Sequence, residues 1–141
     1  MIDPLENNDV IARIGPPGDV QIFSLDEARE VLPILIKLTH AAVQALEPVQ
    51  GRLRRTLPCD PRLPKIELEY ERQVRRWIGK VERLGLVARG LWWIDIDVGE
   101  GFMCWKYPEI RLDYFHAYNE KPGERRKLSD HSPFFDSELL H

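Results

Sequence analysis

The sequence is poor in the residues that build disulfide frameworks and metal centres. It has two cysteines and four histidines among 141 residues, and Cys59 and Cys104 form no Cys-x-x-Cys pair. Isolated cysteines suit a reducing compartment and argue against a disulfide-stapled scaffold. We therefore predict a cytoplasmic protein that folds without disulfides or metal, and we predict no cofactor.

Long apolar runs and a large excess of one charge are also missing. The longest apolar stretch, around Val31–Ile36, is far shorter than the roughly 18 residues of a membrane span. The N-terminal residues 1–9 are acidic and polar, unlike a secretory signal. With 20 Lys and Arg against 23 Asp and Glu, the net charge is −3, which disfavours a general nucleic-acid binder. We expect no membrane partner and rank nucleic acid as an unfavoured one.

The composition that is present predicts one globular domain. Hydrophobic residues make up 43% of the chain and charged residues 30%, which is enough to build a core. Residues 1–22 are rich in Pro and Gly and predict an irregular arm, with a short extended piece at Val20–Phe23. Residues 23–118 form the predicted domain. Residues 119–141 are a polar C-terminal tail that Phe134 and Phe135 make apolar enough to dock on the domain.

A long helix is predicted at the start of this domain. The segment Ser24-Leu-Asp-Glu27 matches a capping box, in which the first and last side chains bond to each other's backbone amides. Apolar residues then recur at helical spacing through Leu53. Pro33 and Pro48 lie inside this pattern, so we expect one kinked helix over residues 24–56.

A second helix is predicted to return antiparallel to the first. Pro64 suits a first helical turn, and Gly85 suits a left-handed cap at the end. Between them, apolar residues recur at intervals of three and four: Ile66, Tyr70, Val74, Trp77, Ile78, Val81 and Leu84. The two segments predict a helical hairpin.

From Leu86 the pattern alternates as in half-buried strands, starting with a short strand at Leu86–Ala88 and a tight turn at Arg89-Gly90. Trp92, Ile94, Ile96 and Val98 share one parity, and Trp93, Asp95 and Asp97 the other. A two-residue loop at Glu100-Gly101 would pair Ile96 with Trp105 and Asp95 with Lys106. A three-residue loop would place Lys106 beside Ile94, so we favour the shorter loop.

A further turn at Pro108-Glu109 would pair Trp105 with Leu112 and Met103 with Tyr114. The whole pattern predicts an α+β fold: a kinked antiparallel helical hairpin packed on one face of a small, three- to four-stranded antiparallel β-meander.

Three pieces of the chain resemble one known family when taken in order. The first is Phe23-Ser-Leu-Asp-Glu-Ala-Arg-Glu-Val-Leu-Pro33, and the second is Leu84-Gly85-Leu86-Val87. The third is Cys104-Trp105-Lys106 followed by Pro108-Glu109-Ile110, Tyr114-Phe115-His116, Gly123 and Arg126. In this order they resemble an uncharacterised bacterial family known as domain of unknown function 2203. The resemblance implies a helical hairpin joined to a small sheet, and it implies no activity.

One constellation of site residues follows from the predicted register. It aligns Asp97, Cys104 and Asp113 across three strands of the polar face, with the two carboxylate backbones about 10 Å apart. His116 has the parity of Tyr114 and would lie at the rim of the core. Asp113, three residues earlier, would point to the opposite face, so an Asp113–His116 dyad is disfavoured. These four residues would form a ligand or metal site, with hydrolysis as one use. The alternative is a solvated face whose charges pair across strands.

The same polar face would carry an aromatic patch of Leu91, Trp93, Phe102 and Phe115, with Phe102 beside Phe115. Such a patch needs a cover, either the tail, a second copy or another protein. No known catalytic motif is present, so we predict no catalytic residues and a non-enzymatic interaction module, a homo-oligomer or a binder of an unknown protein. A ligand or metal protein and a nucleic-acid accessory protein are the alternatives. The last depends on basic residues near the hairpin tip: Arg52, Arg54, Arg55, Arg62 and Lys65.

Overall fold

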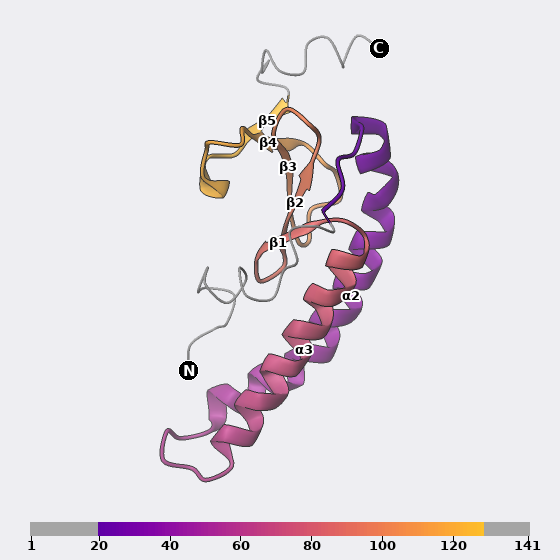
Figure 1. Ribbon diagram of the computed structural model, residues 1–141. Helices are drawn as coiled ribbons and strands as arrows, with labels where there is room; N and C mark the ends of the chain where they lie inside the picture. Colours follow the sequence, from indigo (N-terminus) through magenta and orange to yellow (C-terminus); the bar gives the residue numbers. More distant parts are fainter. Residues whose placement is uncertain (1–19, 129–141) are drawn as a thin grey trace.

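The computed structural model describes residues 20–128, which form two long helices followed by five short strands (Figure 1). Helix α2 spans Leu25–Arg55 and helix α3 spans Leu63–Arg83. The remaining elements, in order, are β1 (Val87–Gly90), β2 (Trp93–Asp97), β3 (Phe102–Lys106), β4 (Tyr114–His116), the short 3-10 helix Pro122–Glu124 and β5 (Arg126–Lys127). Residues 1–19 of the predicted arm (1–22) and residues 129–141 of the predicted tail (119–141) lie outside the described residues.

Helix α2 begins at the predicted capping box. The Ser24 hydroxyl accepts a hydrogen bond from the Glu27 amide at 3.0 Å, and the Glu27 carboxylate accepts one from the Ser24 amide at 2.9 Å. The helix continues through Pro33 and Pro48, because its apolar face is continuous across both prolines and packing against α3 offsets the lost backbone bonds.

Helix α3 completes the predicted hairpin. Pro64 lies in its first turn, and Gly85 follows its end with a φ of 85°. The loop between the helices lies at one end of the molecule, whereas the sheet packs beside the opposite end, next to the start of α2 (Figure 1). The hairpin therefore projects beyond the sheet. Among residues 20–128, neither helix has the length and apolar character needed to cross a membrane.

The strands form a single antiparallel meander in the order β1-β2-β3-β4-β5. One face packs against the helices, and its side chains are fully buried with those of α2 and α3. The main contributors from the sheet are Ile94, Ile96, Met103, Trp105 and Phe115. The predicted α+β fold is confirmed, with a strand count slightly above the predicted one. The helices cover one sheet face, and we call the opposite face the outer face.

The β2–β3 register differs from the predicted one by two residues. Ile96 pairs with Met103 and Asp97 pairs with Phe102, so the turn is centred between Gly99 and Glu100, one residue earlier than the predicted Glu100-Gly101 loop. The amide of Val98 donates to the carbonyl of Gly101 at 3.0 Å. A slip of two residues leaves each side chain on its predicted face, and this is why the apolar face of β2 was still assigned correctly.

The β3–β4 register differs by one residue, and this error reverses a face. Met103 pairs with Phe115, and Cys104 pairs with Tyr114, instead of Met103 with Tyr114. The connection occupies residues 107–113, where the Glu109 carboxylate accepts from the Lys106 amide at 2.8 Å. Because this loop replaces the predicted Pro108-Glu109 turn, Phe115 lies in the core and His116 on the outer face, the reverse of the prediction.

Both edges of the sheet also differ from prediction. Strand β1 continues to Gly90, with an irregularity between Ala88 and Gly90, and the turn falls two residues later than predicted, at Leu91 and Trp92. Trp92 has a φ of 62°. At the other edge β5 pairs with β4, so residues predicted as tail extend the sheet.

The turn after β2 gives a direct test of this packing. A Cβ added at Gly101 would lie 2.5 Å from the Phe115 ring and 2.7 Å from the His116 carbonyl oxygen. We expect Gly101→Ala to destabilise the fold by about 2 kcal/mol, because the neighbouring backbone cannot move aside without disturbing the pairing. At Gly123 the added atom meets nothing within 4 Å. Gly123→Ala should therefore stay within about 0.5 kcal/mol of the wild type in urea unfolding. Equal effects of the two substitutions would contradict the close packing at the turn.

Candidate functional site

The outer face of the sheet contains a buried charged cluster centred on Asp95. Alternation along β2 and β3 places six side chains on this face: Trp93, Asp95, Asp97, Phe102, Cys104 and Lys106. Tyr114 and His116 of β4 join them. Asp95 and His116 are both buried, so this face is only partly open to solvent.

Asp95 is held by groups from strands on either side of β2. Its Oδ2 atom accepts a hydrogen bond from Arg89 Nε of β1 at 2.8 Å and lies 2.8 Å from His116 Nε2 of β4. The His116 side chain crosses strand β3 to reach it. Burying an unpaired carboxylate is very costly, and two charged donors offset this cost. The other oxygen, Oδ1, is buried and has no hydrogen-bond partner among residues 20–128.

The surroundings of His116 favour its charged form. Nε2 faces the Asp95 carboxylate, and Nδ1 lies 3.2 Å from the carbonyl oxygen of Ala117. Both neighbours are acceptors, so a ring protonated on both nitrogens satisfies both contacts. Burial alone lowers the pKa of His116, but the hydrogen bond and the charge of Asp95 outweigh it and raise the pKa above 6.5. Neither ring nitrogen is left free to act as a base or as a metal ligand.

Cys104 lies opposite Asp95 on β3 and is fully buried. Its Sγ atom accepts from Trp93 Nε1 at 2.8 Å and lies 4.0 Å from a guanidinium nitrogen of Arg125. Burial, and then the negative charge of Asp95, raise the pKa of Cys104 to about 11. The thiol is protonated at neutral pH, which is unfavourable for nucleophilic catalysis.

Cationic side chains cover the aromatic rings of the outer face. The Lys106 ammonium lies 3.9 Å from the centre of the Trp93 ring. The Arg125 guanidinium lies 3.8 Å from the Tyr114 ring. The Arg89 guanidinium lies 4.9 Å from the Phe102 ring. Each contact has cation–π geometry, which orders both partners.

The predicted ligand or metal residues do not converge. Cys104 and His116 both border the Asp95 cluster, but Asp97 accepts hydrogen bonds from the Gly99 amide and the Tyr118 hydroxyl. Asp113 is exposed in the loop before β4. Within residues 20–128, no group of three or more His, Cys, Asp or Glu side chains is placed to hold a metal ion.

The predicted aromatic patch is also divided. Trp93 and Phe102 lie half-buried on the outer face. Phe115 is 1% exposed in the core, so its predicted place beside Phe102 was wrong, because the β3–β4 register shifts by one residue. Leu91 packs against the core. Tyr114 and Tyr118 are the aromatic residues of this face that the sequence did not indicate, and their signal depended on the same register.

The prediction missed Asp95 and Arg89 as site residues. Asp95 lies between Ile94 and Ile96, in the middle of a strand predicted to have one buried face. A carboxylate in the middle of such a strand is a signal for a buried charge with partners on neighbouring strands. The partners themselves depend on strand order, which the sequence leaves open.

Comparison with known families assigns the chain. The model of a family described as an uncharacterized conserved protein, DUF2203, matches residues 21–128. The chain therefore belongs to the DUF2203 family, as the resemblance predicted. The comparisons with curated proteins and with solved structures found no match.

The charged His116 ring makes stability depend on pH. Because its pKa in the folded state lies above 6.5, its contribution is fully present below pH 6.5 and is lost as the pH rises through the folded-state value. Losing this charged hydrogen bond in His116→Gln should cost about 2 kcal/mol on the acidic side. The difference from the wild type should shrink as the pH rises.

Urea unfolding of both proteins over a pH series tests this expectation. Arg111→Gln, which changes an exposed residue of the β3–β4 loop, is the control and should show a flat difference across the series. A difference for His116→Gln that stays constant, or grows with pH, would rule out the charged ring.

Proposed function

We propose that this DUF2203 protein is a non-enzymatic interaction module that self-associates through the outer face of its sheet. The observation that carries the proposal is the aromatic content of a face that helices leave uncovered. Trp93, Phe102 and Tyr114 are half-buried, and Tyr118 is 49% exposed. Trp, Tyr and Arg are the residue types that dominate binding energy at protein interfaces.

Most charges on this face are already neutralised within the chain. Arg89 is paired with Asp95, and Arg125 is paired with both oxygens of Glu109 at 3.0 and 2.8 Å. Covering a neutralised pair with a partner leaves no isolated charge without water. Cation–π contacts also become stronger when they lose solvent. This face can therefore be desolvated at a smaller cost than its number of charges implies.

Charge complementarity favours a second copy of the chain as the partner. Lys106 lies at one end of the β2–β3 pair, and Asp97 with the exposed Glu100 lies at the other. A two-fold axis through the middle of the face would place Lys106 of one copy against Glu100 of the other, twice. Neither Lys106 nor Glu100 has an ion-pair partner in the described part of the chain, so both can form this contact with a second copy.

The alternatives receive less support from the geometry. A ligand or metal site built from His116, Asp97, Asp113 and Cys104 requires convergent, free donor atoms. Instead His116 and Cys104 contact their own neighbours, and Asp113 lies outside the strands. For a nucleic-acid role, two of the five hairpin-tip cations, Arg52 and Arg62, are already ion-paired, which leaves fewer of them for phosphate.

Charge reversal tests the proposed contact. Lys106→Glu and Glu100→Lys should each weaken self-association by at least about tenfold, because each places like charges opposite one another. The double variant should recover most of the wild-type affinity, because it exchanges the two charges and keeps them complementary. Sedimentation equilibrium over a range of concentrations measures all four proteins.

Lys65→Glu is the matched control, since Lys65 is an exposed residue at the start of α3, away from the sheet. It should associate like the wild type. A wild-type protein that stays monomeric at the highest concentrations, or a double variant no better than the single ones, would remove self-association through this face.

A further inference from the structure

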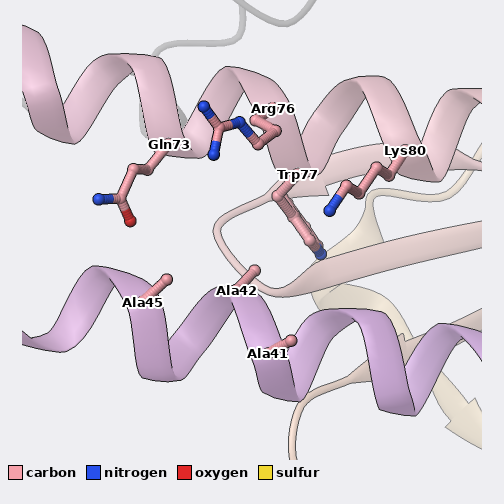
Figure 2. Close-up of a pocket in the computed structure, with 7 residues that line it drawn as sticks. All are labelled: Ala41, Ala42, Ala45, Gln73, Arg76, Trp77 and Lys80. Atoms are coloured by element: carbon pink, nitrogen blue, oxygen red, sulfur yellow. The ribbon is translucent and has the colours of Figure 1, made fainter.

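A cavity of about 110 Å³ lies between the two helices of the hairpin, away from the outer face of the sheet. Figure 2 shows three alanines of α2 on one side and four longer side chains of α3 on the other. The lining residues are Ala41, Ala42, Ala45, Gln73, Arg76, Trp77 and Lys80. The small alanine side chains leave the space that larger residues would fill.

The aromatic wall of this cavity is held in a fixed orientation. Trp77 is 1% exposed, and its Nε1 atom donates to the Thr39 hydroxyl of α2 at 3.0 Å. The Trp92 ring packs against the same ring in an edge-to-face arrangement, with 4.9 Å between ring centres. Because the indole is locked from two sides, its position does not depend on a ligand.

An acceptor without a partner lies in the cavity wall. The Gln73 side chain points into the gap between the helices (Figure 2), and its Oε1 atom is buried with no hydrogen-bond partner among residues 20–128. Buried polar atoms of folded proteins are nearly always satisfied by protein, water or a bound molecule. The Gln73 oxygen would be satisfied by a hydrogen-bond donor on a molecule that occupies the cavity.

The charge at the cavity is positive. Arg76 and Lys80 are exposed and flank Trp77 along α3, and among residues 20–128 no acidic residue lines the cavity. Neither cation has an ion pair within residues 20–128. An anionic group at the rim would therefore meet two cations with no competing carboxylate in the cavity wall.

From these contacts we infer that the hairpin cavity binds a small aromatic carboxylate carrying a hydroxyl or amine donor. The ring lies over the alanines beside the rim of Trp77, the donor bonds to Gln73, and the carboxylate meets Arg76 and Lys80. A dry protein cavity of roughly 150 Å³ holds benzene. The observed space is smaller, so part of the ligand extends through the open side. This site is independent of self-association through the sheet.

Three probes separate the parts of the inference. 4-Hydroxybenzoate has the ring, the carboxylate and the donor, whereas benzoate lacks the donor and 4-methylphenol lacks the carboxylate. Calorimetry should give 4-hydroxybenzoate a Kd of roughly 0.1–1 mM, within the range for so small a ligand, and weaker binding of both analogues. The indole N–H signal of Trp77 should shift in NMR titrations.

Variants then locate the binding site. Lys80→Gln and Arg76→Gln should each weaken 4-hydroxybenzoate binding about tenfold, while Arg72→Gln, an exposed cation of α3 outside the cavity, should leave it unchanged. Ala45→Leu should abolish binding by filling the space without lowering the unfolding temperature. If Ala45→Leu misfolds, Gln73→Leu gives a second test, because removing the acceptor should weaken 4-hydroxybenzoate binding.

Either of two results would overturn the inference. One is that none of the three probes binds at millimolar concentration, which would mean that water alone satisfies Gln73. The other is binding that Ala45→Leu and Gln73→Leu leave intact, because the ligand would then occupy another place. Neither result bears on sheet-mediated association, which the charge-reversed variants measure separately.

Discussion

The buried carboxylate of Asp95 constrains the whole sheet. It has no solvent exposure, so its charge must be compensated by protein groups at hydrogen-bonding distance. Arg89 approaches from β1 and His116 reaches over β3 from β4. These contacts can form together only when the intervening strands hold their observed registers. A single charge in the middle of β2 thereby links four of the five strands of the sheet.

This constraint also explains the chemistry of the outer face. With both ring nitrogens of His116 engaged and the Cys104 thiol protonated, the groups that usually carry catalysis serve the packing instead. The cations over Trp93, Phe102 and Tyr114 complete a second packed layer on the side of the sheet that the helices leave open. This layer is rich in the residue types found at interfaces, and the proposed contact with a second copy rests on them.

The helices could be predicted from the sequence because their signals are local. The Ser24–Glu27 capping box, the proline near the start of α3 and the glycine after its end each act within one turn. The apolar face of β2 was also predictable, since a register error of two residues does not change the face. The face of β4 was not, because it depends on the length of the 107–113 loop, and a slip of one residue reversed Phe115 and His116.

The candidate site could not be predicted for a related reason. Alternation assigned Asp95, Trp93 and Phe102 to the polar face, but it gave no sign that Arg89, His116, Tyr114 and Tyr118 would cover that face. Coverage is a tertiary property, set by side chains from strands far apart in the sequence. The cavity in the hairpin could not be predicted for the same reason. The alanines of α2 indicate an open space only when Gln73 and Trp77 of α3 are known to face them.

The protonation state of His116 tests the central claim most directly. Nitrogen chemical shifts of its ring, assigned by comparison with His116→Gln, report the two nitrogens separately just below pH 6.5, where a raised pKa keeps the ring charged. The account predicts that both carry a proton and that Nε2–H is protected from exchange by its hydrogen bond to Asp95. A neutral ring with one bare nitrogen, or rapid exchange at Nε2, would contradict it.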